Sequence, residues 1–284
     1  MLLTKPKGKE KIINFALWIA AFSTVAILII ILGYILIKGV AHIDLEFLTD
    51  RPRRMGAQGG IFPIIVGTLY FVTLTIMISA PIGVGAAIFL NEYTQENRLT
   101  QIIRFGTELL AGIPSIIFGL FGYLFFVVLL NDLTGGWSLI SGALTATCMI
   151  LPTMIRTAEE ALKTVPRSYR EGSLALGATN WQTIYKVVLP TALPGILTGI
   201  ILGMGRAIGE TAALLLTLGG SLLLPTSIFH GARTLSMHLY MVAMETGNMD
   251  KAFATGVILI TTVLLINFVA KYLVKKLVAR RIGG

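Results

Sequence analysis

Residues 170–190 read REGSLALGATNWQTIYKVVLP, a polar, basic and aromatic stretch between two long apolar segments. Just before it, Pro166 precedes an amphipathic run over residues 167–176. Gly177 then follows that run at the position where a left-handed residue commonly ends a helix. The first half of the stretch therefore predicts a short helix that ends in a tight turn.

The second half of the stretch begins a new helix. Thr179 and Gln182 have the spacing of a capping box, in which each side chain bonds a free backbone N–H of the first turn. We expect this second helix to stop at Pro190. A folded helical hairpin on the face of a membrane protein indicates a docking surface.

The composition is that of a membrane protein. The chain has 284 residues, of which 55% are hydrophobic and 13% charged, and its mean hydropathy is +0.82. The net charge of +9 comes from basic residues at the edges of apolar runs, without the aromatic-interleaved stripe that favours nucleic acid. Cys148 is the single cysteine and lies inside an apolar run, so we expect no disulfide, zinc cluster or thiol catalysis by a Cys/His pair.

Six apolar segments are long enough to cross a bilayer as helices, which takes about 20 residues each. They lie near residues 13–37, 62–90, 103–130, 138–158, 191–220 and 252–274. Because backbone inside a bilayer must satisfy its own hydrogen bonds, the fold class is an all-α polytopic membrane protein with six transmembrane helices. Pro81, Pro114 and Pro152 fall within these segments and are expected to bend them.

The first apolar segment follows a basic patch of lysines at positions 5, 7, 9 and 11, as a signal peptide would. Its apolar core is about twice as long as the ~7–15 residues of a signal peptide, so we interpret it as a retained span. Residues 39–41 (GVA) leave cleavage open as an alternative.

Lysine and arginine set the orientation. In a six-span chain, one face carries the basic residues near both termini, Arg98, Arg104 and those within 156–186. They outnumber the basic residues of the opposite face, which are Lys38, Arg51, Arg53, Arg54, Arg233 and Lys251. The positive-inside rule therefore predicts an inner (plasma) membrane protein with both termini and the hairpin in the cytoplasm.

Two external segments, 39–60 and 221–250, are too short for a domain, so any capture of an external substrate must belong to another protein. We interpret the region of Met237–Met249, with His42, His230 and His238, as an external loop with a short surface helix. No metal site is predicted, since the histidines have no matched acidic or cysteine partner.

The fifth segment carries an intramembrane charged pair. On one helical wheel at about 100° per residue, Gly195, Gly199, Gly203, Arg206 and Glu210 share one narrow face. The glycines predict close approach of another helix. Arg206 and Glu210 have two interpretations: an i, i+4 ion pair that holds helices together, or a substrate pathway in which the guanidinium binds an oxyanion.

The order Glu171, Gly177, Val187, Leu189 and Pro190 resembles the cytoplasmic loop of ABC importer permeases, with Gly172 and Ser173 in place of the family's two alanines. In that family the loop's short helix lies in a groove of the ATPase subunit. The resemblance implies an ATPase coupling contact made by Arg170, Glu171, Gly172, Ala175, Gly177 and Ala178.

The chain offers no energy source of its own. It has no phosphate-binding G-x-x-x-x-G-K-[ST] loop, and the glycine cluster at 203–209 misses the dinucleotide-binding spacing. We therefore predict that the chain is not an enzyme and binds no cofactor, and that ATP and Mg²⁺ are held by a partner ATPase.

Four further stretches narrow the resemblance to phosphate-specific ABC importer permeases, and the short basic N-terminus and overall length favour the PstA subunit. They are GGIFPIIVGTLY (59–70), AGIPSIIFGLFG (111–122), GRAIGETAALL (205–215) and RTLSMHLYMVAMETGNMDKAFATG (233–256). The resemblance implies half of a type I importer for inorganic phosphate. The implied partners are a homologous PstC-like permease, two PstB-like ATPase subunits inside and a PstS-like phosphate-binding protein outside.

The predicted organisation is a basic N-terminus, first span and external segment (1–60), a five-helix transport domain (61–275) with the coupling loop at about 159–190, and a basic tail (276–284). Three alternatives stay open. One is a permease for phosphonate, sulfate or molybdate. Another is an ion-coupled carrier, which would need an internal repeat and a chain of intramembrane acids that this sequence does not show. The third is a membrane enzyme, for which no nucleophile and base set can be named.

Overall fold

Apolar helices of 25 residues or more dominate the molecule, as the hydropathy of the chain requires. The structure is a computed structural model, and it describes residues 8–94 and 97–282. The start of the predicted basic N-terminus, up to Lys7, and the last two residues of the predicted 276–284 tail lie outside this part of the chain.

Five stretches of the described chain are long and apolar enough to cross a membrane, and a sixth is a bent helix pair. The five stretches correspond to most or all of α1 (Gly8–Val40), α3 (Phe62–Ile88) continued by the π-helix η2 (Phe89–Tyr93), α7 (Leu139–Lys163), α10 (Leu189–Gly209) with the helical turns before it, and α13 (Met249–Ile282). This confirms the all-α polytopic fold class.

The predicted span over 103–130 is not one straight helix. It divides into α4 (Arg98–Ala111) and α5 (Ser115–Gly122), which is continued by the π-helix η3 (Tyr123–Leu129), and the two parts are bent by 101°. Pro114 lies at the break and caps α5, because proline has no N–H to donate and disfavours helical backbone before it. Pro81 and Pro152, by contrast, lie inside α3 and α7, which continue through them.

The predicted fifth span over 191–220 is also not a single helix. Helix α10 ends at Gly209, Glu210 is extended with ψ 132°, and a separate short helix α11 (Ala212–Thr217) follows. At its other end α10 begins earlier than predicted: α9 (Asn180–Thr183), the π-helix η4 (Ile184–Val188) and α10 run without interruption through Pro190. The prediction that the hairpin's second helix stops at Pro190 is therefore wrong. The proline lies inside this continuous helix, just after the π-helical segment η4, where the regular backbone hydrogen-bond pattern is already interrupted.

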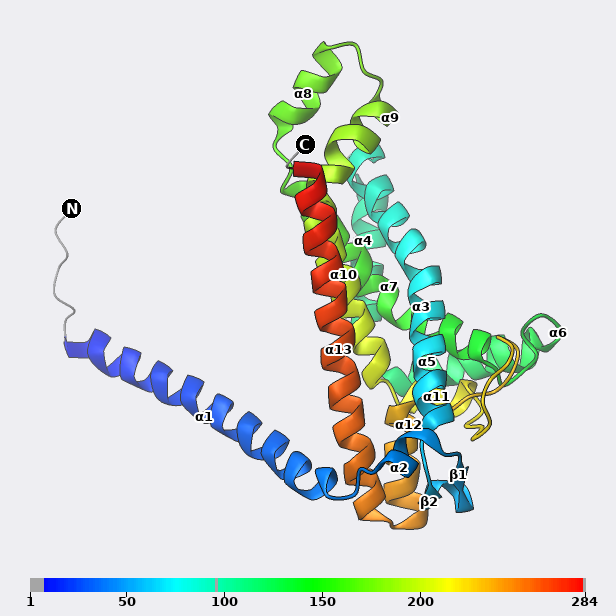
Figure 1. Cartoon of the computed structure of the whole chain (residues 1–284). Coiled ribbons are helices and arrows are strands. Elements are labelled where there is room, and N and C mark those ends of the chain that lie inside the picture. The colour runs from blue at the N-terminus through cyan, green and yellow to red at the C-terminus, as the bar shows by residue number, and fades with distance from the viewer. Residues whose placement is uncertain (1–7, 95–96, 283–284) are drawn as a thin grey trace.

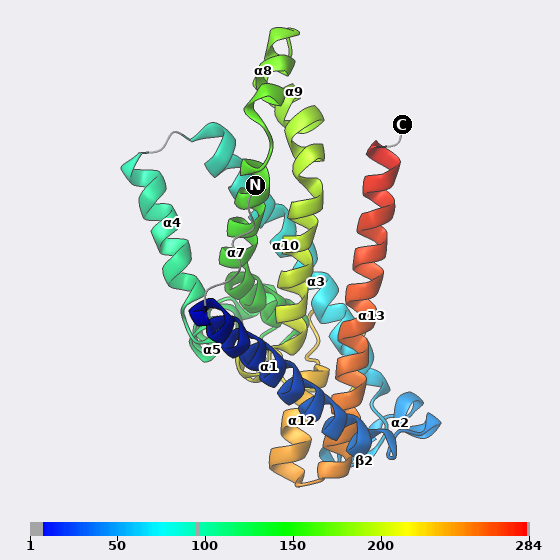
Figure 2. The same ribbon diagram turned by 90° about the vertical axis from the view of Figure 1, so that its left-hand side faces the viewer.

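The bundle has two ends of different character. Figures 1 and 2 show α8 (Arg167–Ala175) and α9 projecting at the end where α13 finishes. The opposite end holds short elements: α2 (Leu45–Thr49), the antiparallel pair β1 (Pro52–Arg53) and β2 (Gln58–Gly59) around η1 (Arg54–Gly56), α12 (Leu235–Met241) and the π-helix η5 (Val242–Thr246). The short helix α6 (Asn131–Thr134) projects from the side of the bundle (Figure 1).

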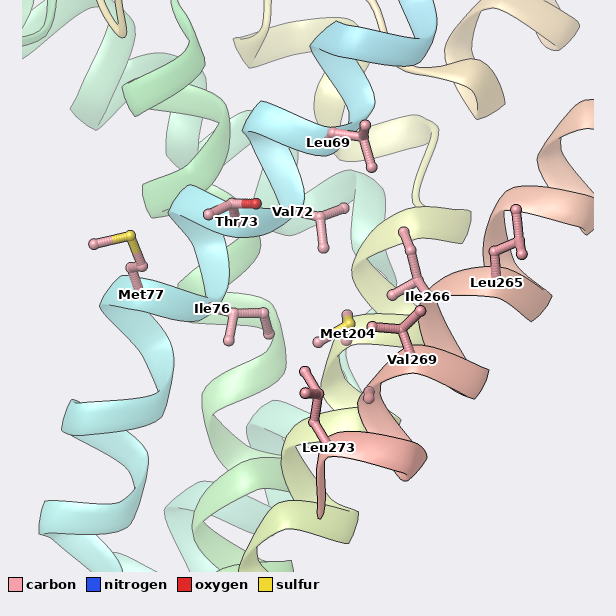
Figure 3. Close-up of a pocket in the computed structure, with 11 residues that line it drawn as sticks. Leu69, Val72, Thr73, Ile76, Met77, Met204, Leu265, Ile266, Val269 and Leu273 are labelled. Atoms are coloured by element: carbon pink, nitrogen blue, oxygen red, sulfur yellow. The ribbon is translucent and has the colours of Figure 1, made fainter. Parts of the chain in front are cut away.

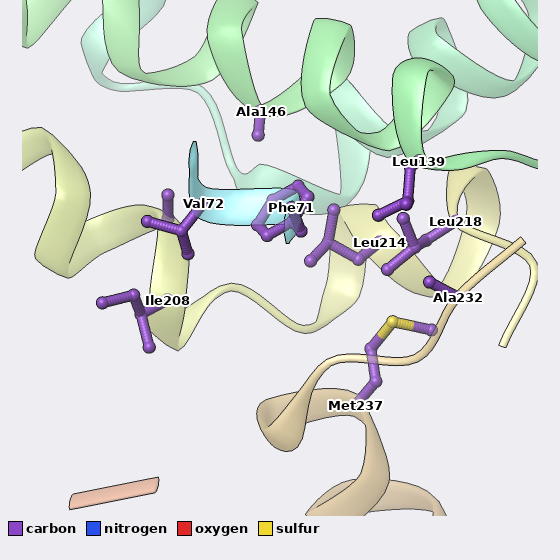
Figure 4. Close-up of a cluster of buried hydrophobic side chains, with 10 residues drawn as sticks. Phe71, Val72, Leu139, Ala146, Ile208, Leu214, Leu218, Ala232 and Met237 are labelled. Carbon is purple, nitrogen blue, oxygen red and sulfur yellow. The ribbon is translucent and has the colours of Figure 1, made fainter. Parts of the chain in front are cut away.

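Helix α12 is not the surface helix that we predicted for residues 237–249. Leu235, Ser236, Met237 and His238 are all buried, and Met237 joins the main core cluster. That cluster brings together Phe71 and Val72 of α3, Leu139 and Ala146 of α7, Ala207 and Ile208 of α10, Leu214 and Leu218, and Ala232 (Figure 4).

Helix α1 stands apart from the rest of the bundle. Figures 1 and 2 show it extending away obliquely, and its apolar residues are almost all exposed. Its contacts are with α13, where Gly39 lies against the backbone of Phe253 and the ring of Tyr34 meets that of Phe253 edge to face at 5.6 Å. A helix this apolar requires lipid or another apolar helix around it.

Candidate functional site: an exposed helical hairpin and the end of helix α10

The predicted hairpin forms from the local signals in its sequence. Pro166 precedes α8, and Gly177 follows α8 with φ +83°. Thr179 and Gln182 form the complete capping box at the start of α9. The hydroxyls of Ser173 and Thr183 lie 2.9 Å apart and tie the two arms together.

The tip of the hairpin exposes a group of apolar and aromatic side chains that sequence reasoning did not single out. Leu176 is 91% exposed, and Trp181 and Tyr185 are each 62% exposed with their rings stacked at 6.3 Å. Of the predicted coupling residues, Glu171, Gly172, Ala175 and Gly177 are exposed beside them, and Ala178 is half-buried. The signal was present in the sequence as two aromatic residues four positions apart on a polar loop. Together these residues form a surface suited to docking a protein.

Arg170 does not belong to that exposed surface. Its guanidinium turns toward the bundle and forms an ion pair with Glu92, in which Nη2 lies 2.7 Å from Oε1. It also donates to the carbonyl oxygens of Leu162 and Val165. The structure therefore gives Arg170 a role inside the chain, and an ATPase contact by Arg170 stays a prediction.

The three glycines of α10 face α7. A Cβ on Gly199 would meet the side chain of Thr157, and one on Gly195 would lie 2.6 Å from the Cβ of Ala161. A Cβ on Gly203 would lie 3.0 Å from Met154. The absence of side chains thus lets α10 pack closely against α7.

The prediction that Arg206 and Glu210 share one helical face is wrong. Arg206 is exposed in the last turn of α10, where a cation complements the helix dipole. Glu210 lies beyond the helix, and its carboxylate accepts the backbone N–H of Ala213 at 3.1 Å. Within the described residues no ion pair joins the two side chains. The interpretation as an i, i+4 structural pair is wrong, because the backbone leaves the helix before Glu210.

The region around Glu210 is anchored by polar residues of the short elements. Ser236 of α12 donates its hydroxyl to the Glu210 carbonyl at 2.6 Å. Arg233, which is buried, donates to the carbonyls of Gly220 and Met55. Burial lowers the pKa of Arg233, and burial beside Arg233 lowers the pKa of His238 to about 3. His238 is therefore a neutral, buried side chain.

The side of the bundle carries an apolar groove of about 420 Å³ between α3, α10 and α13 (Figure 3). Its lining includes Val72, Ile76, Met204, Ile266 and Val269. Since this lining offers almost no hydrogen-bond donors, the groove suits an acyl chain or an apolar helix and not an oxyanion.

Comparison with known proteins identifies the family. The family described as binding-protein-dependent transport system inner membrane component matches residues 79–283. The probable ABC transporter permease protein YqgI of Bacillus subtilis is 37% identical over 284 residues, covering 94% of this chain and 95% of the relative. The phosphate transport system permease protein PstA of Xylella fastidiosa (strain Temecula1) is 34% identical over 239 residues, covering 83% and 82%.

Solved structures share the fold. A bacterial alginate ABC transporter in complex with an alginate pentasaccharide-bound periplasmic protein aligns with a TM-score of 0.67 at 16% identity over 98% of both chains. The inward-facing MetNI methionine ABC transporter aligns with a TM-score of 0.59 at 22% identity over 74% of this chain and 92% of the other.

The bundle with its exposed hairpin is thus a type I ABC importer permease fold. The chain belongs to the inner membrane components of binding-protein-dependent transport systems. The relatives confirm the resemblance to PstA permeases and the prediction of a transport subunit that is not itself an enzyme. This family excludes the alternatives of an ion-coupled carrier and a membrane enzyme.

Proposed function

We propose that this chain is one half of the translocation pathway of an ATP-driven importer for inorganic phosphate. The observation that carries the substrate class is Arg206, an exposed guanidinium at the end of α10 with no ion-pair partner among the described residues. Guanidinium suits bidentate contact with a phosphate oxyanion. Similarity over most of the chain to several permeases named for phosphate transport supports the choice of phosphate.

The proposed assembly has two permease subunits, two ATPase subunits and an external phosphate-binding protein. A homologous second permease would complete the pathway, since one chain offers Arg206 on an open face. The ATPase would dock on the hairpin tip around Leu176, Trp181 and Tyr185, which gives an apolar centre that becomes buried on binding. ATP and Mg²⁺ would be held by that ATPase.

The proposed orientation places the hairpin and both termini in the cytoplasm, as the lysine and arginine asymmetry predicts. The β1–β2 hairpin at the opposite end would then face outside. In a background with Cys148 replaced, a single cysteine at Arg53 should react with an impermeant maleimide on intact cells, and one at Ser168 should react only after permeabilisation. The reverse pattern would refute the orientation.

The decisive experiment is uptake by the purified complex in proteoliposomes. Tagged chain should copurify with an ATPase and a second permease, and ATP inside the vesicles with the binding protein outside should drive accumulation of labelled phosphate. Sulfate, molybdate and phosphonate are added in excess as competitors. Failure of phosphate to accumulate while one of these oxyanions does would replace phosphate with that substrate.

A further inference from the structure

The ion pair between Arg170 and Glu92 joins two parts of the chain that are far apart in sequence. Arg170 lies in α8 of the hairpin, and Glu92 lies in η2, the continuation of α3. Nη2 of the arginine lies 2.7 Å from Oε1 of the carboxylate, and Nε lies 3.2 Å from Oε2. Two parallel N–H···O bonds fix orientation as well as distance.

Further hydrogen bonds hold both side chains of this pair in place. Arg170 donates from Nη1 to the Val165 carbonyl at 2.7 Å and from Nη2 to the Leu162 carbonyl at 3.1 Å. The side-chain amide of Asn91 donates to Glu92 Oε1 at 2.6 Å. The Glu92 side chain is only 9% exposed and that of Arg170 is 21% exposed. The pair is therefore shielded and geometrically determined, unlike a mobile surface ion pair.

The chain itself connects the hairpin to only two of the core helices. Helix α7 leads into α8 through residues 164–166, and α9 leads through η4 into α10. Helix α3 has no direct chain connection to the hairpin, although its C-terminal end packs through Ala87 in one apolar cluster with α7 and α10. Arg170 and Glu92 supply the missing direct connection.

We propose that the Arg170–Glu92 pair is the joint through which movement of the hairpin is passed to α3, with Arg170 as a positioning residue. The inference rests on the proposed docking of the ATPase on this hairpin and does not depend on which anion is carried. A displacement of α8 then moves α3, α7 and α10 as one unit. Without the pair, α8 can tilt on its two chain connections while α3 stays in place.

Spin labels test the rigid link directly. In the assembled complex with Cys148 replaced, labels are placed at Ser168 on α8 and at Phe89, an exposed residue of η2. Their distance distribution should be the same with ATP, with ADP and without nucleotide. In the Glu92→Gln variant, which keeps the shape and removes the charge, the distribution should broaden or shift between these states. A wild-type distance that changes with nucleotide would overturn the proposal.

The amount of ATP used per imported anion is a second measurement, and it should not change if the pair only stabilises the fold. Glu92→Gln and Arg170→Lys complexes should bind the ATPase and hydrolyse ATP, yet use roughly fivefold or more ATP per anion imported. The matched control is Arg156→Gln, which removes an exposed ion pair with Glu160 inside α7 and should leave the ratio unchanged.

The outcomes separate the two proposals. A wild-type chain that copurifies with no ATPase would refute the proposed function. A wild-type complex that couples normally, with Glu92→Gln indistinguishable from it in both distance and ATP use, would refute the joint alone.

Discussion

The side chain of Thr157 in α7 occupies the space that a Cβ on Gly199 of α10 would need. The hydroxyl of Thr157 is itself directed to the Thr153 carbonyl at 2.9 Å, so it is held in this position. The contact sets how closely two of the long helices approach, and it lies between the hairpin and Arg206 along α10.

Replacement of Gly199 by valine should therefore force α7 and α10 apart. Overpacking of this kind costs about 1–3 kcal/mol, and we expect less assembled protein and a lower thermal aggregation temperature in detergent. Gly205→Ala is the matched control, because a Cβ on Gly205 of the same helix meets no atom within 4 Å. Equal stability of the two variants would contradict the packing role of Gly199.

Replacement of Gly177 tests the role of the left-handed backbone at the hairpin turn, because a new side chain there would meet no neighbouring atom. The φ of Gly177 is +83°, and a Cβ there has no neighbour within 4 Å. Gly177→Val should thus cost roughly 1–2 kcal/mol through backbone strain alone and distort the turn. We expect normal membrane insertion, loss of transport, and weaker disulfide cross-linking between a cysteine at Ala175 and the ATPase.

Gly172→Ala separates strain from bulk in that experiment. Gly172 also has open space around it but lies within α8, where alanine is favourable. Transport by Gly172→Ala should match wild type. If Gly177→Val also matches wild type in transport and cross-linking, the left-handed turn has no role in coupling.

Arg206 is expected to act on the anion and not on Glu210. Arg206→Lys keeps the charge but loses the bidentate fork, and since charge-assisted hydrogen bonds contribute about 1.5–3 kcal/mol, uptake should fall roughly tenfold or more. The measurement is labelled phosphate uptake in vesicles, normalised to assembled complex.

The charge-swapped double variant Arg206→Glu with Glu210→Arg decides between the two roles. The structure predicts no rescue, because Glu210 is outside the helix and its carboxylate holds the N–H of Ala213. Substantial recovery of uptake in the swap would remove Arg206 as a substrate contact.

His238 predicts a loss of stability on mild acidification. Its pKa is lowered to about 3 from an ordinary 6.5, so between these values the unfolded chain binds a proton that the folded chain does not. This difference leaves the free energy of unfolding unchanged above pH 6.5. As the pH drops toward 3 it lowers the free energy of unfolding, by about 2 kcal/mol at pH 5. The melting temperature of the complex in detergent should fall accordingly between pH 7.5 and pH 5.

His238→Gln should flatten this pH dependence even if it lowers stability overall. The control is His230→Gln, since His230 is exposed and its replacement should leave the slope unchanged. A slope that persists in His238→Gln would assign the effect to other groups.

Local signals in the sequence determined a large part of this structure. Mean hydropathy and segment length gave the helical membrane fold, since a bilayer leaves few other ways to satisfy the backbone. The capping box at Thr179 and the left-handed turn at Gly177 were predicted because both depend on residues within one or two turns. The motif spacing of residues 171–190 likewise predicted the hairpin from the sequence.

Tertiary structure decided what depends on contacts between distant segments. Apolar periodicity continues through Glu210 and across Pro114, so it could not show that α10 ends at Gly209 or that the third span bends by 101°. The partner of Arg170 lies 78 residues away in Glu92, and no local pattern links them. Similarly, His238 is buried because α12 packs into the main core cluster through Met237. Hydrophobic pattern fixes which segments leave water, whereas packing between helices fixes where they break and which charges meet.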